Sequence, residues 1–140
     1  MTHRFRATSA ILVVEDDCLL RMLTADIVSE AGFVALQAAN ADEALAILSA
    51  RSAVDVLLTG VVMAGSMDGI RLAHEAHKRR PLLKIIVASG GPGLSNARLP
   101  GGCRTLRKPY HAAAMISTID SLIGADPDYS LKAPHFFLDA

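Results

Sequence analysis

The sequence lacks net charge, has only two cysteines, and contains no long uninterrupted apolar run. Fourteen basic residues balance fourteen acidic ones, so the overall charge does not favour binding to nucleic acid or to an anionic membrane surface. Cys18 and Cys103 are too few and too far apart for a disulfide framework or a zinc module, which predicts free thiols. No segment approaches the roughly 20 apolar residues of a membrane-spanning helix. We therefore expect a cytoplasmic protein without nucleic-acid or membrane partners.

What the sequence does have is a large apolar fraction. Hydrophobic residues make up 51% of the chain and charged residues 20%, a composition typical of a folded domain with a core. With 140 residues we expect one compact domain over 9–124, a short extension over 1–8 and a tail over 125–140. The tail carries a Phe136-Phe137-Leu138 cluster that is able to pack on the domain or on a partner.

Short apolar runs alternate along the chain with segments of helical periodicity. The runs predict five strands, over residues 10–14, 33–38, 54–59, 83–88 and 104–106. Helices are expected after the first strand, ending at Gly32, after an N-cap at Asn40, and over about 69–80 and 110–123. The Gly/Pro-rich segment 90–102 leaves room for one helical turn at most, around 95–99. This order predicts an α/β fold: an open five-stranded parallel sheet with helices on both faces and a shortened fourth helix.

Polar residues follow three of the five predicted strands. Glu15 and Asp16 follow the first, Ser89 the fourth and Lys108 the fifth, whereas Gly60 follows the third. In open α/β sheets, ligands gather at the carboxyl ends of the strands, near the point where the strand order reverses. We therefore expect two carboxylates, a hydroxyl and an ammonium group to converge around a residue that has no side chain.

Four segments in this order resemble the receiver domains of response regulators over about residues 9–123. The segments are ILVVEDD, DVLLTGVVMAGSMDG, KIIVASG and LRKPY. The resemblance implies a flavodoxin-like receiver fold and a non-enzymatic module of two-component (phosphorelay) signalling. In this family, a carboxylate at the end of the third strand attacks a phosphoryl group held by Mg²⁺ and forms an acyl phosphate.

The resemblance also implies a role for each residue at the strand ends. Glu15, Asp16 and the backbone carbonyl of Val62 match the metal ligands. Ser89 matches the hydroxyl that follows the phosphoryl group, and Lys108 matches the cation that balances its charge. These roles come from the position of each residue in the family's motifs.

The sequence departs from the family at the phosphate-accepting position, where counting back three residues from Met63 gives Gly60. Glycine has no atom that attacks phosphorus or ligates a metal, so the covalent step is excluded at this position. Ala64 replaces the usual loop proline, and Thr105 stands where the family has a switching aromatic ring. We therefore expect a degenerate module that binds a histidine kinase, a phosphotransfer protein or another regulator without phosphorylation, with Mg²⁺ held weakly at most. The sequence does not determine the oligomeric state.

Two other functions remain open. One is phosphorylation at a non-standard carboxylate, such as Asp16 or Asp68, although Asp68 is better placed to cap the third helix. The other is a small-ligand-binding flavodoxin-like protein, which the absence of GxGxxG and GxxxxGK[ST] loops argues against.

Several single residues also have a structural interpretation beside the functional one. Lys108 is able to pair directly with Glu15 or Asp16, and Ser89 is equally consistent with a turn residue. His74 and His77 are spaced for a metal, but without a third ligand nearby they indicate a solvated helix face.

Overall fold

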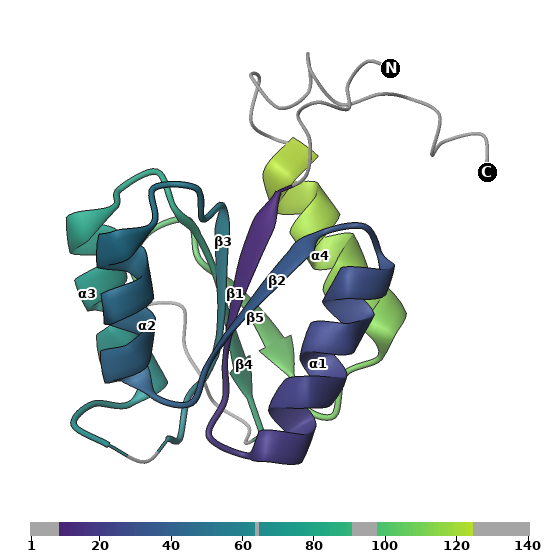
Figure 1. Cartoon of the computed structure of the whole chain (residues 1–140), viewed down its shortest axis with the longest axis horizontal. Coiled ribbons are helices and arrows are strands. Elements are labelled where there is room, and N and C mark those ends of the chain that lie inside the picture. The colour runs from purple at the N-terminus through teal and green to yellow at the C-terminus, as the bar shows by residue number, and fades with distance from the viewer. Residues whose placement is uncertain (1–8, 64, 91–97, 125–140) are drawn as a thin grey trace.

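The structure is a computed structural model of the chain, and it describes residues 9–63, 65–90 and 98–124. These residues form a parallel sheet between two layers of helices (Figure 1). The strands are β1 (Ala10–Val14), β2 (Val34–Ala38), β3 (Val56–Gly60), β4 (Lys84–Ser89) and β5 (Arg104–Arg107). The helices are α1 (Cys18–Glu30), α2 (Ala41–Ala50), α3 (Gly69–Arg79) and α4 (Ala112–Gly124). The predicted α/β fold is therefore confirmed.

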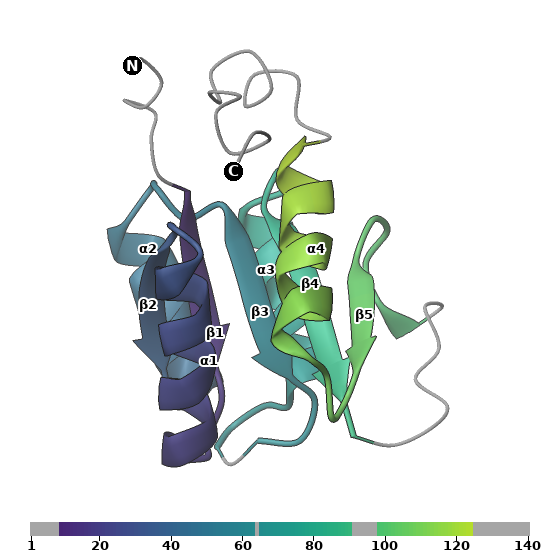
Figure 2. The same cartoon turned by 90° about the vertical axis from the view of Figure 1, so that its right-hand side faces the viewer.

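The strand order is β2-β1-β3-β4-β5, so the order reverses between β1 and β3. Figure 1 shows α2 and α3 on one face of the sheet, and Figure 2 shows α1 and α4 on the other. The register pairs Val14 with Thr59 and Gly60 with Ala88, which brings the carboxyl ends of β1, β3 and β4 to one edge. Gly60 is thus the last residue of β3, one residue beyond the predicted end of that strand.

Two apolar clusters hold the layers together, one on each face of the sheet. Leu12 and Leu57 point to the α2/α3 face, whereas Ile11 and Val56 point to the α1/α4 face. All four are fully buried. Strands buried on both faces read as continuous apolar runs, which is why the sequence shows no alternation there.

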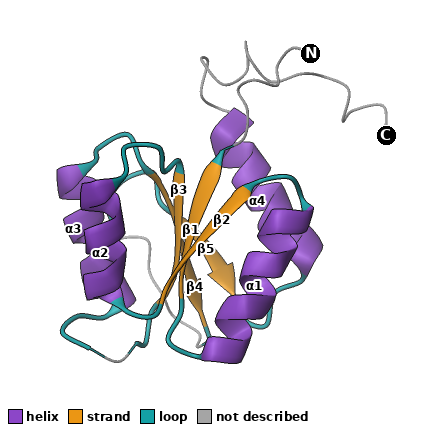
Figure 3. Cartoon of the chain, viewed as in Figure 1, coloured by secondary structure: helices purple, strands orange, loops and turns teal. Residues whose placement is uncertain are grey.

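Figure 3 shows the helices in purple, and the three that follow β1, β2 and β3 each begin at a capping residue. Side-chain oxygens of Asp17, Asn40 and Asp68 accept the backbone N–H three residues on, at 3.0, 2.9 and 2.8 Å. Such caps satisfy N–H groups that have no partner within the helix. The structure thereby confirms Asp68 as the cap of the third helix and shows that Asp17 and Asn40 cap the first two.

Helix α1 has the predicted helical spacing of apolar residues, but part of its apolar row faces outward. Leu19 is 67% exposed and Leu23 is 52% exposed, whereas Thr24 is buried. The last helix begins at Ala112, two residues after the predicted start. No helix in the described part of the chain has the length and apolar character to span a bilayer.

Several predictions concern residues outside the described ranges. The extension 1–8 and the tail 125–140 are among them, as is most of the single turn expected around 95–99. From that turn, Leu99 is described; it is 7% exposed and packs in the apolar cluster on the α2/α3 face.

Candidate functional site

Gly60 lies between Glu15 and Lys108 at the carboxyl edge of the sheet. A Cβ atom built on Gly60 would lie 3.4 Å from Oε1 of Glu15 and 3.6 Å from Nζ of Lys108. Both distances are ordinary van der Waals contacts, so the surrounding atoms leave room for a side chain at this position. The strand ends of β1, β3 and β5 therefore meet around a residue that contributes only backbone atoms.

Glu15 and Lys108 form an ion pair with each other. Nζ of Lys108 lies 3.2 Å from Oε1 of Glu15, and their side chains are 29% and 11% exposed. The other carboxylate oxygen, Oε2, accepts the backbone N–H of Asp17 at 3.1 Å. Direct pairing of Lys108 with a β1 carboxylate was one of two interpretations of the sequence, and it is the one present. Glu15 thus neutralises the ammonium group in the absence of a third carboxylate.

The space next to Gly60 is small. A pocket of about 10 Å³, partly open to solvent, lies there and is lined by side chains that include Thr24, Thr59, Lys108 and Tyr110. That volume corresponds to about one water molecule.

The remaining residues of the expected site lie around this cluster with different exposures. Asp16 and Thr105 are exposed, and Val62 is 86% exposed. Ser89 is half-buried at the end of β4, where its carbonyl accepts the backbone N–H of Lys108 at 2.7 Å. This bond fixes the start of the Lys108 segment beside β4 and therefore helps to aim the ammonium group at Glu15.

The donor set does not fit a tightly held Mg²⁺ ion. Magnesium takes hard oxygen ligands in near-octahedral geometry, commonly one or two carboxylates with other oxygen donors. Here Glu15 is paired with Lys108, and Gly60 supplies no carboxylate. Among the described residues, no three His, Cys, Asp or Glu side chains gather as a metal site.

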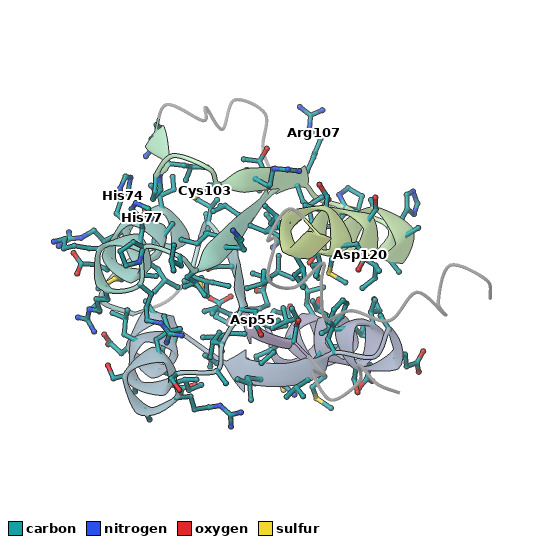
Figure 4. The ribbon with its side chains drawn as sticks, turned by 90° about the horizontal axis from the view of Figure 1, so that it is seen from above. Asp55, His74, His77, Cys103, Arg107 and Asp120 are labelled. Atoms are coloured by element: carbon teal, nitrogen blue, oxygen red, sulfur yellow. The ribbon has the colours of Figure 1, made fainter. Side chains whose placement is uncertain are left out.

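The two histidines of α3 have other surroundings. Nε2 of His74 lies 2.7 Å from the carbonyl oxygen of Arg98, a hydrogen bond that ties α3 to the segment before β5. His77 is half-buried one turn further on (Figure 4). Among the residues that the structure describes, no further side chain completes a metal site with these two histidines.

The loop after β3 requires glycine at position 69, and the sequence analysis did not identify this requirement. A Cβ atom on Gly69 would overlap the carbonyl oxygen of Gly60 and lie 2.7 Å from its carbonyl carbon. The backbone N–H of Gly69 donates to the carbonyl of Val61 at 2.7 Å, which closes the loop onto the end of β3. The Asp68-Gly69 dipeptide was the only available signal, and it was interpreted as a helix start.

Comparisons with known proteins agree with this fold. The family model described as response regulator receiver domain matches residues 11–120. The receiver domain of NtrX from Brucella abortus superimposes with a TM-score of 0.75 at 30% identity and covers 83% of this chain and 99% of that one. A CheY-like receiver domain protein from Methanospirillum hungatei gives a TM-score of 0.75 at 28% identity, covering 82% and 93%.

A curated relative is much longer than this chain. The DNA-binding transcriptional regulator NtrC of Salmonella typhimurium is 28% identical over 116 residues, which are 81% of this chain and 24% of that regulator. The chain therefore spans about a quarter of the length of that regulator.

Proposed function

Because the chain belongs to the response regulator receiver domain family, whose members act in two-component signalling, we propose that it signals by binding a partner without being phosphorylated at the usual position. The observation that carries this proposal is the place of Gly60. Its missing side chain would project between the carboxylate of Glu15 and the ammonium group of Lys108. That is the arrangement around a phosphate-accepting aspartate that the family resemblance implies, and here the acceptor oxygen is absent.

The chemistry supports the same conclusion. An acyl phosphate needs a carboxylate nucleophile, a divalent metal and a cation for the phosphoryl oxygens. This chain lacks the nucleophile at Gly60, and Lys108 is 3.2 Å from Glu15 instead of being held by an aspartate of β3. We therefore propose that Mg²⁺ binds weakly at most. We also propose that the Lys108–Glu15 ion pair keeps the carboxyl ends of the strands in a single conformation.

Helix α1 presents a surface suited to a protein partner. Leu19, Met22 and Leu23 lie at positions i, i+3 and i+4 and are 67%, 51% and 52% exposed. A contiguous apolar patch exposed on a protein surface is a candidate interaction site. We propose that this row contacts a histidine kinase, a phosphotransfer protein or another regulator.

Phosphorylation is tested by incubating the purified chain with acetyl phosphate and Mg²⁺ and recording its intact mass. We expect no mass increase of one phosphoryl group in the natural chain. Gly60→Asp serves as the matched variant, since a side chain fits there, and gain of the adduct would show that the rest of the pocket is competent. A stable adduct on the natural chain would contradict the proposal.

Partner binding is tested with a histidine kinase or phosphotransfer protein encoded beside this chain's gene. Isothermal titration with the natural chain is compared with Leu23→Glu, and with Ser29→Glu as an exposed control on the same helix. We expect Leu23→Glu to weaken binding at least tenfold, equivalent to about 1.4 kcal/mol. If Leu23→Glu and Ser29→Glu bind the partner with the same affinity, the apolar row of α1 is not part of the interface.

The two rival functions have less support. Phosphorylation at Asp68 would use a carboxylate whose Oδ1 already accepts the N–H of Arg71 at 2.8 Å. If Asp68 is the phosphorylated residue, the phosphoryl adduct should be lost in Asp68→Asn. Binding of a flavin or nucleotide is disfavoured because no strand is followed by a GxGxxG or GxxxxGK[ST] phosphate-binding loop. A thermal-shift screen with both ligand classes tests that second rival.

A further inference from the structure

A second hollow lies at the opposite end of the sheet, where β4 begins and α4 ends. It has a volume of about 180 Å³ and lies among α3, the start of β4, the turn before β5 and the end of α4. We call it the β4–β5 groove. Figure 4 looks onto this end and labels His77 and Cys103, which both line the groove. The groove is remote from Gly60, so it belongs to no part of the site described above.

The groove has the size and character of a site for one aromatic ring. Its walls include Ile85, Leu122 and Leu83, which are 2%, 5% and 8% exposed. Leu82 lies at its edge and is 89% exposed. An apolar cavity of about 150 Å³ is large enough to bind benzene. A highly exposed leucine beside an apolar hollow of this volume indicates a surface that an apolar group covers.

We propose that the β4–β5 groove binds the Phe136-Phe137-Leu138 segment of the same chain. Leu122 lines the groove, and α4 ends two residues later at Gly124. The segment itself lies outside the described residues, and twelve positions along the chain separate Gly124 from Phe136. Twelve residues span up to about 40 Å when extended, which is ample to return to a groove beside the end of α4.

Charge complementarity favours this occupant. Residues 125–139 contain three aspartates and one lysine, so the tail is acidic. Lys84 and His77 line the groove, and Lys78 and Arg79 follow in the last turn of α3. Opposite charges steer a segment toward its binding surface and disfavour wrong partners. A tether also gives an effective concentration of about millimolar, so a weak contact is enough to fill the groove.

The two cysteines provide a direct test with an internal reference. Cys103 lines the groove, is half-buried, and has its pKa raised by burial, whereas Cys18 is exposed on α1. The full chain is alkylated with iodoacetamide, and the labelling rate of each cysteine is followed by peptide mass spectrometry. The natural chain is compared with Phe136→Ala/Phe137→Ala and with Lys132→Ala, a tail control that keeps the aromatic cluster.

We expect the double variant to label Cys103 about five times faster or more, because a groove that is mostly filled becomes mostly empty. Cys18 should react at the same rate in all three proteins, and Lys132→Ala should match the natural chain. An unchanged ratio of the Cys103 to the Cys18 rate in the double variant would overturn the proposal. Protection of Cys103 that disappears on dilution would also overturn it, since it would assign the occupant to a second molecule.

A second measurement does not depend on thiol chemistry. Amide chemical shifts of Leu83, Lys84 and Ile85 should change in the double variant at all protein concentrations, because an aromatic ring no longer lies beside them. Shifts identical to those of the natural chain would contradict the proposal. Thermal melting of each variant establishes that the domain remains folded during both measurements.

Discussion

Nζ of Lys108 lies 3.2 Å from Oε1 of Glu15 and joins the segment after β5 to the end of β1 in front of Gly60. A second ion pair, between Lys78 and Glu75 on α3, has almost the same length, 3.4 Å. The two differ in exposure: the lysine side chains are 29% exposed in the first pair and 75% in the second. Because the distances are similar, we expect the more buried Lys108–Glu15 pair to contribute more to stability than the exposed Lys78–Glu75 pair.

Lys108→Met should lower the free energy of unfolding by about 1–3 kcal/mol, because it leaves the buried carboxylate of Glu15 without its cation. Lys78→Met, the matched surface variant, should change it by about 0.5 kcal/mol or less. Urea denaturation of both variants measures the difference. The double variant Glu15→Gln/Lys108→Met should recover part of the loss, since no uncompensated charge remains. Equal effects of the two lysine replacements would show that the first pair is no stronger than a surface pair.

Gly60 and Gly69 should respond differently to the same small substitution. Gly60→Ala places a methyl group at ordinary contact distance from Glu15 and Lys108, so a change within about 1 kcal/mol is expected. Gly69→Ala places it on the Gly60 carbonyl, and we expect a loss of at least about 2 kcal/mol as the loop shifts. Thermal denaturation of the two variants, side by side, gives the comparison. A Gly60→Ala loss as large as that of Gly69→Ala would mean that the space at Gly60 is not available.

Asp68 should behave as a helix cap. Asp68→Ala should destabilise the domain by about 1 kcal/mol, while Asp68→Asn should lose only a few tenths, because asparagine is an equally good N-cap. Chemical denaturation of both variants provides the measurement. Comparable losses for alanine and asparagine would indicate that the charge of Asp68, rather than its hydrogen bond to the N–H of Arg71, is what the domain uses.

Asp120 on α4 should give the domain a weak pH dependence. Partial burial raises the pKa of Asp120 above its usual value of 3.8, so between the two values the folded state holds more protons than the unfolded state. This contribution favours the folded state at low pH, and it is lost as the pH rises through the raised pKa. Because the side chain is partly exposed, solvent screening keeps the effect small.

Asp120→Asn removes that titration. Melting temperatures recorded from pH 3 to pH 8 should show the variant slightly more stable than the natural chain at neutral pH, with the difference disappearing at acid pH. Asp26→Asn, at an exposed aspartate of α1, is the matched control and should not reproduce this pattern. Melting curves for Asp120→Asn that stay parallel to those of the natural chain at every pH would contradict the expectation.

The sequence by itself determined the order of the elements and the place where they meet. Continuous apolar runs mark strands buried on both faces, and caps such as Asn40 and Asp68 mark helix starts, because both signals depend on neighbours within a few residues. Parallel strands bring their carboxyl ends to one edge, so the approach of Gly60 to Glu15 and Lys108 followed from the strand ends alone. Only local patterns and a common topology were needed for these features.

The tertiary structure alone decided which partner each group meets. Helical spacing shows that Leu19 and Leu23 share a face but not that the face is left uncovered, since covering depends on elements elsewhere in the chain. Likewise, the overlap that forbids a side chain at Gly69 and the 180 Å³ groove beside Leu82 arise between segments distant in sequence. Packing is a property of surfaces brought together in space, and a one-dimensional pattern carries no record of the distances between them.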